Sequence, residues 1–220
     1  MALGVGLLTS LSVFGIGNSA QALILTYTIQ TDFLNAIQLG YYQENFESIS
    51  ITGTPPSPIN YTNGTYSYQA SVSGLGSNEF YGAGSSGDKW LSANNANDSI
   101  NFTNFSPTIK AIGGFFFPSD VSGALTTGII NVSVNGGSSS LSTVTGSATN
   151  FFGFISNDAT PITSLVVNTS FTGTSIWPTV NNLIVGQPIV AEPVPEPVTI
   201  LGTLLAGGLG VAFKKKQKSL

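Results

Sequence analysis

Apolar and polar residues alternate strictly along several short stretches in the middle of the chain. In residues 65–73 every second position is aromatic or aliphatic, while serine and glutamine occupy the positions between. The alternation recurs in 130–134, and the turn-forming segments Asn63–Gly64 and Asn135–Gly137 lie next to these two stretches. Because successive side chains of a strand point to opposite faces, this pattern predicts half-buried β-strands joined by tight turns.

Other stretches are apolar at consecutive positions. Residues 109–117 and 151–155 are dense in aromatic and branched side chains, as expected of strands buried in the middle of a sandwich. Further strands are expected over 99–105, 162–168 and 181–185, which makes about eight or nine in all. The best candidate for a helix is 32–39, with Asp32 as its N-cap.

Turn residues separate these stretches at intervals of about ten residues, a spacing typical of all-β sandwiches. We therefore predict that residues 23–191 form one all-β domain, a two-sheet antiparallel sandwich with jelly-roll topology. A domain of this length buries enough surface to be stable without cross-links. An N-terminal signal helix and a short C-terminal transmembrane helix are expected to flank it.

The N-terminal segment has the pattern of a signal peptide. Residues 2–17 are apolar and uncharged, and small residues follow at Ala20 and Ala22. Signal peptidase admits only small side chains beside the scissile bond, so we predict a signal peptide over 1–22, cleaved after Ala22 or alternatively after Ala20. The usual basic segment is missing, and a buried N-terminal helix of the mature domain is the alternative interpretation.

The C-terminal segment combines a proline-rich stretch (192–197), an uncharged apolar run (198–213) and a basic end (214–220). The alternating prolines form a stiff, extended spacer. As a helix the apolar run spans only about 24 Å, less than the roughly 30 Å of a bilayer's hydrocarbon core. The lysines that stop transfer, and so leave the body outside, are Lys214, Lys215, Lys216 and Lys218.

A short motif precedes the apolar run and consists of Val194, Pro195, Glu196 and Pro197. Together with the glycine-containing helix and the basic end, it resembles the sorting tail of the PEP-CTERM family, whose basic cluster is usually arginine-rich. The resemblance implies processing by an exosortase, a Gram-negative-type envelope and a host that makes exopolysaccharide. The alternative is an ordinary single-span membrane protein with a proline-rich stalk.

Composition excludes several kinds of chemistry. Only 7% of the residues are charged, and the chain contains no Cys, His or Arg. A thiol nucleophile, a Cys/His zinc site, a histidine base and a disulfide framework are therefore excluded. Between the targeting segments the only lysines are Lys89 and Lys110, against eight acidic residues. This acidic balance argues against nucleic acid or anionic lipid as a partner.

A second resemblance concerns the body. Phe46–Glu47, Phe151–Phe154 and Val180–Leu183 resemble segments of jelly-roll domains in other exported proteins and in carbohydrate-binding modules. This resemblance implies a structural calcium between an early Glu and a late Asp, for which the matching positions are Glu47 and Asn181. Asn in place of Asp removes a charge and weakens a site for a hard cation. A solvent-facing Glu47 is the alternative.

Sugar recognition requires an exposed aromatic residue with polar neighbours. Trp90 is the first candidate, close to Tyr81 and within the polar segment 82–98, which we expect to be a loop. Trp177 is the second candidate. The alternative for either tryptophan is that it caps the end of the core.

We do not expect an enzyme. A glycosidase needs two converging carboxylates, and the eight acids of the body form no recognisable constellation. The sequence instead predicts a protein that signal peptidase and an exosortase process, that the inner membrane holds transiently, and that ends at the cell surface or in the extracellular matrix. We expect a structural or adhesive role; the alternatives are a carbohydrate-binding module acting on exopolysaccharide and a secreted glycan-active enzyme.

Overall fold

The computed structural model of the protein describes residues 24–76, 78–137, 139–143, 147–156, 160–170 and 175–189. The predicted signal peptide (1–22) and sorting tail (192–220) lie outside these residues. Within the described ranges, no helix has both the length and the apolar character needed to cross a bilayer. The structure therefore concerns the body between the two predicted targeting segments.

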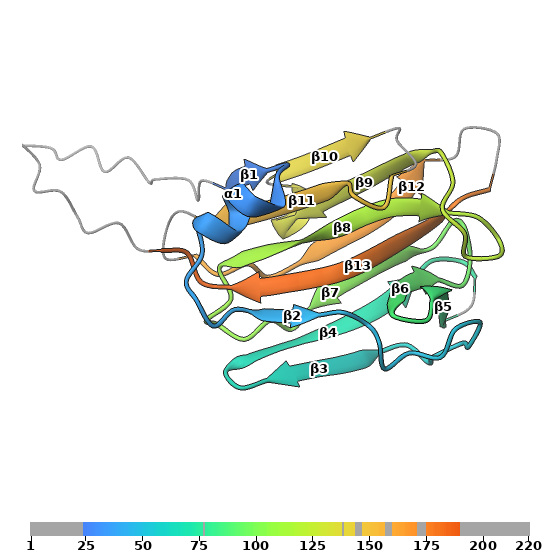
Figure 1. The fold of residues 1–220 in the computed structure, drawn as a ribbon, viewed down its shortest axis with the longest axis horizontal. Helices are drawn as coiled ribbons and strands as arrows, with labels where there is room; N and C mark the ends of the chain where they lie inside the picture. The colour runs from blue at the N-terminus through green and yellow to red at the C-terminus, as the bar shows by residue number, and fades with distance from the viewer. Residues whose placement is uncertain are drawn as a thin grey trace, which may run out of the picture. The chain divides into compact units, whose positions relative to one another are not determined.

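The body consists of two antiparallel sheets packed as a sandwich, which confirms the predicted two-sheet antiparallel architecture (Figure 1). The six-stranded sheet contains, in spatial order, β10 (Ser139–Thr143), β9 (Ile129–Val134), β12 (Leu165–Ser170), β7 (Ser99–Thr103), β4 (Tyr66–Ser73) and β3 (Ile59–Asn63). The seven-stranded sheet contains β1 (Ile24–Tyr27), β11 (Phe151–Ser156), β8 (Ala111–Ser119), β13 (Trp177–Gly186), β6 (Asp88–Ala93) and β5 (Phe80–Ser85), with β2 (Tyr42–Glu44) also paired to β13.

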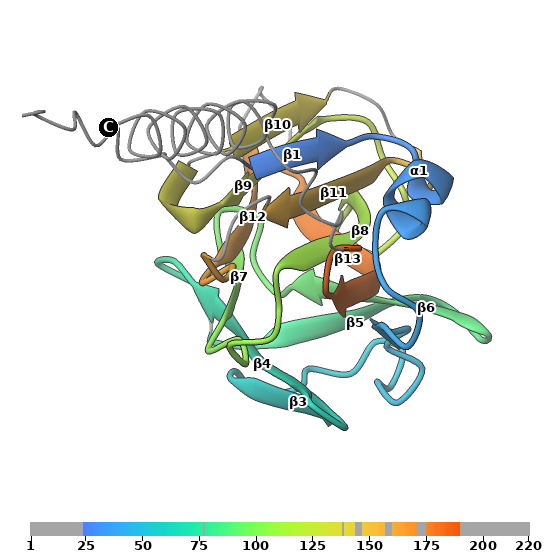
Figure 2. The same ribbon diagram turned by 90° about the vertical axis from the view of Figure 1, so that its left-hand side faces the viewer.

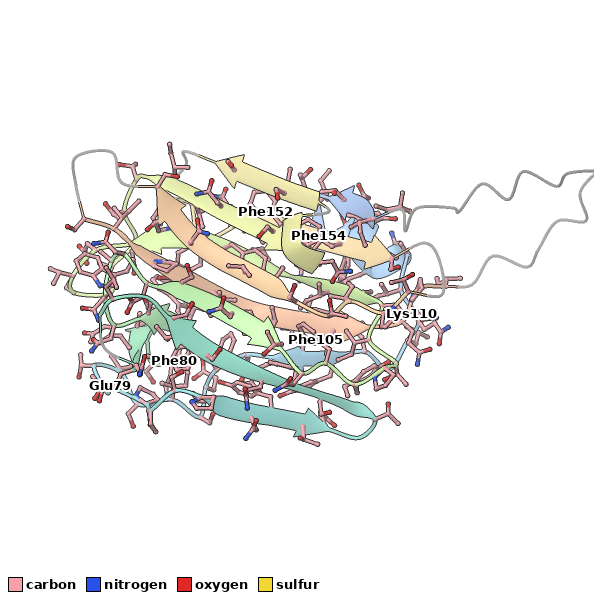
Figure 3. All side chains as sticks on the ribbon, turned by 180° about the vertical axis from the view of Figure 1, so that it is seen from behind. Glu79, Phe80, Phe105, Lys110, Phe152 and Phe154 are labelled. Atoms are coloured by element: carbon pink, nitrogen blue, oxygen red, sulfur yellow. The ribbon has the colours of Figure 1, made fainter. Side chains whose placement is uncertain are left out.

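The alternation in the sequence decides which side chains enter the core. In β4 and β9 every second residue is buried, and these residues meet the inward side chains of the seven-stranded sheet in one hydrophobic core. Phe152 and Phe154 lie between the two sheets (Figure 3). The predicted turns are found at the expected places: β3 pairs with β4 across Gly64, and β9 pairs with β10 across the turn η1 (Asn135–Gly137).

The seven-stranded sheet is also covered on its outer face, which explains its dense apolar strands. All six residues of β11 are buried. A short helix, α1 (Gln30–Asn35), lies on this face and inserts the fully buried Phe33 (Figure 2). The ring occupies the space that glycines leave open, because a Cβ atom at Gly153 would lie 2.5 Å from Cδ2 of Phe33.

The first strand starts and the last strand ends at the same end of the seven-stranded sheet. Ile24 lies opposite Ser156 at the start of β1, and Gly186 lies opposite Ala111 at the end of β13. Lys110 lies at this end, which we call the Lys110 end, and Glu79 lies at the opposite end, the Glu79 end (Figure 3). The described strands therefore begin, at Ile24, and end, at Gly186, at the Lys110 end.

Two expectations about local structure were wrong, the number of strands and a loop, and the short helix that was expected is present with different bounds. The described residues form thirteen strands, more than predicted, because short strands such as β2 and β10 have too few residues to show a clear period. The helix covers 30–35, with Ile29 as its N-cap and Asp32 inside its first turn. The segment 82–98 contains all of β6 and most of β5, so the predicted loop there is a hairpin.

Candidate functional site

The outer face of the seven-stranded sheet brings several predicted site residues together. Ser92 of β6 lies opposite Tyr81 in β5 and opposite Thr179 in β13, so these three residues share one face. Side chains two residues apart along a strand project from the same face. The predicted site residues on this face are therefore Tyr81, Trp90, Trp177 and Asn181.

Trp90 is part of this sheet face. We had predicted an exposed platform in a loop, so this prediction was wrong. It lies in β6 and is half-buried, with its ring edge-on to Phe117 at a centroid distance of 4.8 Å. Its indole Nε1 is buried and has no hydrogen-bond partner among the described residues. The loop prediction failed because the Ser, Gly and Asp residues at 85–88 form only the tight hairpin turn, in which Gly87 has a φ of 85°.

Tyr81 and Trp177 line a common cavity of about 100 Å³ at the Glu79 end. The two aromatic residues come from β5 and from the first position of β13. The rest of the lining contains three polar residues, Ser92, Asn94 and Asp120, and two apolar ones, Ala93 and Val121. The structure thus joins two of the three predicted aromatic residues and leaves Trp90 outside the cavity.

Hydrogen bonds fix the orientation of Trp177 and of Ser92 in the cavity lining. The Trp177 Nε1 donates to the backbone carbonyl of Asn94 at 3.2 Å. Beside it the hydroxyls of Ser92, Ser119 and Thr179 form a buried cluster, in which Thr179 Oγ1 lies 2.7 Å from Ser119 Oγ and donates to Ser92 Oγ at 3.1 Å. Ser92 is the member of this cluster that lines the cavity, and the hydrogen bonds of its hydroxyl are already made within the protein.

Asp120 forms one wall and stabilises the loop that carries it. Its Oδ1 accepts hydrogen bonds from the Ser122 amide (2.9 Å), the Ser122 hydroxyl (2.7 Å) and the Ala124 amide (2.9 Å). These bonds, led by the one from the Ser122 hydroxyl, lower the pKa of the Asp120 carboxyl below its ordinary value. The Asp120 carboxyl group is thus ionised at neutral pH.

The same loop approaches Tyr81 closely. A Cβ atom at Gly123 would lie 2.9 Å from Cε1 of Tyr81, and Gly123 has a φ of 77°. Both the contact and the backbone conformation favour glycine. Sequence analysis did not include Asp120 in the site, although Asp120–Ala124 has the Asp, Ser and Gly composition typical of a side-chain-stabilised turn.

The two residues of the predicted calcium site are each hydrogen-bonded to the start of β6. Glu47 Oε1 accepts a hydrogen bond from the Lys89 amide at 3.0 Å, and Lys89 Nζ donates to the Glu47 carbonyl at 2.6 Å. Asn181 Nδ2 donates to Asp88 Oδ1 at 2.8 Å. In the described part of the chain, no group of three or more Asp, Glu, His or Cys residues is arranged to hold a metal ion.

A larger cavity of about 410 Å³ lies beside the edge strand β3. Its lining, which sequence analysis did not identify, includes Ser48, Ile49, Ser50, Thr54, Ile59 and Tyr61. Tyr61 stacks on Tyr68 with a centroid distance of 5.1 Å and is only 8% exposed. The Tyr61 ring is therefore part of the core, and none of the described residues that line this cavity is charged.

A group of tyrosines lies behind this cavity. The hydroxyl of Tyr42 donates to Oε2 of Glu44, whereas the buried hydroxyl of Tyr68 has no partner among the described residues. Desolvation by burial, with a smaller contribution from the Glu44 charge, raises the pKa of Tyr42, Tyr61 and Tyr68 well above the ordinary value. These phenols therefore stay neutral and act as core residues.

The chain was compared with protein-family models, with curated proteins and with solved structures, and no match was found in any of the three.

Proposed function

We propose that this chain is an exported protein of the cell surface or extracellular matrix, sorted by an exosortase through its C-terminal tail. The observation that carries the proposal is the order of the V-P-E-P motif, the thin apolar run and the lysine end in 192–220. Eight Leu, Ile, Val and Phe residues in the run contribute only about 2 to 5 kcal/mol to insertion, and four glycines weaken it further. Such a helix suits a temporary anchor, from which the mature protein is later released.

The proposed role is structural or adhesive. The body is a two-sheet sandwich, and its first strand starts and its last strand ends at the Lys110 end. Carboxylates that an enzyme would need for catalysis already accept hydrogen bonds that stabilise the fold. Glu47, Asp88 and Asp120 each accept hydrogen bonds from the protein itself. This supports a binding protein over a glycan-active enzyme.

A carbohydrate-binding module is the second candidate, because Tyr81 and Trp177 line one cavity with polar neighbours. The jelly-roll assignment belongs to this proposal. Successive strands from β6 to β9 alternate between the two sheets, as connections in jelly rolls do. A glycan array probed with the purified full chain separates the candidates, since a purely structural role predicts no binding to any polysaccharide.

Structural calcium between Glu47 and Asn181 stays a proposal with a simple test. A ligand that binds only the folded state raises the melting temperature. A calcium site predicts a lower melting temperature of the full chain after treatment with a chelator, and recovery when calcium is restored. An unchanged melting temperature would exclude the calcium site. The positive charge near Glu47 would then come from Lys89 alone, whose Nζ donates to the Glu47 carbonyl.

Mass spectrometry of the protein from its native host tests the sorting proposal. We expect the mature N-terminus at Leu23, or at Gln21 if cleavage follows Ala20, and we expect the lysines of 214–218 to be absent. Glu196→Ala should block processing, whereas Glu192→Ala, a matched change outside the motif, should not. Recovery of unprocessed protein with its lysines attached, stable in the inner membrane, would contradict the proposal.

A further inference from the structure

We propose that the cavity between Tyr81 and Trp177 binds the terminal sugar of a neutral polysaccharide chain, end-on. This inference deepens the proposed adhesive role and takes its biological setting from it. The binding of the sugar, however, depends only on the cavity, so it can be tested on protein whose sorting tail has not been processed.

The cavity presents both kinds of surface that a sugar ring needs. A pyranose has an apolar face of C–H groups, which packs on aromatic rings, and a rim of hydroxyls, which needs hydrogen-bond partners. Tyr81 and Trp177 supply the aromatic surface. Asp120 uses Oδ1 for its own loop, while its Oδ2 and the Tyr81 hydroxyl make no hydrogen bond to the described residues. Two polar atoms are therefore left for a ligand.

These groups are held in place before a ligand arrives. The Trp177 indole is bonded to the Asn94 carbonyl, the Asp120 carboxylate is fixed by three hydrogen bonds, and Gly123 is packed against Tyr81. Little rotamer freedom remains to be lost on binding, which favours affinity. The cavity is thus a preorganised site, in contrast to a surface of mobile polar side chains.

The size of the cavity limits what it can hold. Its volume of about 100 Å³ is well below the roughly 300 to 1,000 Å³ of pockets that enclose a whole small ligand. Only part of one sugar ring fits inside. A chain end can enter such a cavity, whereas an internal sugar is linked on both sides and would need an open groove. The site therefore recognises chain ends.

The negative charge at the cavity discriminates between neutral and acidic sugars. Asp120 lines the cavity, and a second carboxylate, Glu79, accepts a hydrogen bond at 3.4 Å from Asn94, which also lines it. Lys110 is at the opposite end of the sandwich (Figure 3). An acidic sugar such as a uronate would place its charge beside these carboxylates without compensation, which is unfavourable. Neutral sugars carry no such penalty.

The test uses the purified full chain in a detergent that has no sugar headgroup. Binding is measured by calorimetric titration with a neutral oligosaccharide series and with the parent polymer, at equal mass of sugar. We expect binding to follow the concentration of chain ends, so that shortening the polymer increases it in proportion. A uronate polymer of matched length should bind at least tenfold more weakly. Binding that follows the total number of sugar units, or equal binding of uronates, would overturn the proposal.

Variants locate the site. Tyr81→Ala and Trp177→Ala should each weaken binding at least tenfold, and Asp120→Asn should reduce the discrimination against uronates. The matched control is Trp90→Phe, an aromatic change on the same face but outside the cavity, which should leave affinity unchanged. Melting temperatures show which variants remain folded, and Tyr81→Phe tests the hydroxyl alone if the alanine variants do not fold.

Two results would refute the inference while leaving the sorting proposal intact. One is the absence of binding by the folded protein to every neutral glycan tested. The other is binding that survives in folded Tyr81→Ala and Trp177→Ala. Conversely, a chain that binds sugar ends but is not processed in its host would refute only the sorting proposal.

Discussion

Asn181 Nδ2 donates a hydrogen bond of 2.8 Å to Oδ1 of Asp88, and Asn181 is only 6% exposed. The bond joins the middle of β13 to the first residue of β6 on the outer face of the seven-stranded sheet. The Asn181 amide supplies a hydrogen-bond donor to Asp88, which a carboxylate in this position would not. An Asp at position 181 would instead place two carboxylates in contact.

Asn181→Asp should therefore destabilise the protein at neutral pH. Two carboxylates in contact repel each other, and one of them must take up a proton in the folded state. We expect the melting temperature to fall at pH 7 and the loss to shrink as the pH is lowered towards 4. Asn181→Leu removes the hydrogen bond without adding charge, so its effect should not vary in this way. A pH-independent loss for Asn181→Asp would contradict the explanation.

The Asp120 turn should weaken in acid. The folded-state pKa of this carboxyl is lowered, so its stabilising effect is complete above the unfolded pKa and is lost as the pH falls through the folded pKa. NMR titration should place the carboxyl pKa of Asp120 below that of an Asp in a model peptide. The Ser122 and Ala124 amides should lose their protection against exchange at the same low pH, when each rate is compared with the intrinsic rate of an unprotected amide at that pH. An ordinary titration of Asp120 would show that the three hydrogen bonds do not form in solution.

Gly153→Ala should destabilise the sandwich by about 1 to 3 kcal/mol through overpacking. The added Cβ atom would lie 2.5 Å from Cδ2 of Phe33, whose ring is fully buried beneath α1. Gly114→Ala is the control, because its nearest neighbour would be 3.3 Å away. Chemical denaturation measures both. In a double-mutant cycle, Phe33→Ala should relieve part of the effect of Gly153→Ala, and strict additivity would exclude the contact as its cause.

Tyr68→Phe and Tyr42→Phe should have opposite effects on the free energy of unfolding. The Tyr68 hydroxyl is buried without a partner among the described residues, and an unpaired buried polar group costs about 1 to 3 kcal/mol. Its removal should leave stability unchanged or raise it. Tyr42 donates to Glu44, so its removal should lower stability by about 1 kcal/mol. A Tyr68→Phe protein that is less stable than the Tyr42→Phe protein would contradict the structure.

The tyrosine group should also make the protein sensitive to alkali. Above a pH of about 10 the unfolded chain loses its phenol protons, whereas the raised pKa values keep Tyr42, Tyr61 and Tyr68 neutral in the folded state. Stability should therefore fall as the pH rises beyond the unfolded pKa. Absorbance at the phenolate band should show these three tyrosines ionising together with unfolding. Their ionisation in the intact fold would argue against burial.

Sequence patterns determined the fold class of the body, because the alternation of apolar and polar residues reflects a local property of the backbone. Side chains two residues apart must share a face, so the buried rows of β4 and β9 and the turns at 63–64 and 135–137 could be assigned without any partner strand. The composition likewise excluded thiol and histidine chemistry and a Cys/His zinc site. The strand and turn assignments need only residues that are neighbours in the sequence, and the chemical exclusions need only the number of residues of each type.

Which distant residues meet was decided by strand order and register. Tyr81 and Trp177 are separated by 96 positions and share a cavity only because β5, β6 and β13 lie side by side. Trp90, the first sequence candidate for a sugar platform, is half-buried against Phe117, whose place beside it depends on β8 pairing with β13. No local pattern contains that information, since the energy of such contacts arises between segments that sequence separates and only the folded sheet brings together.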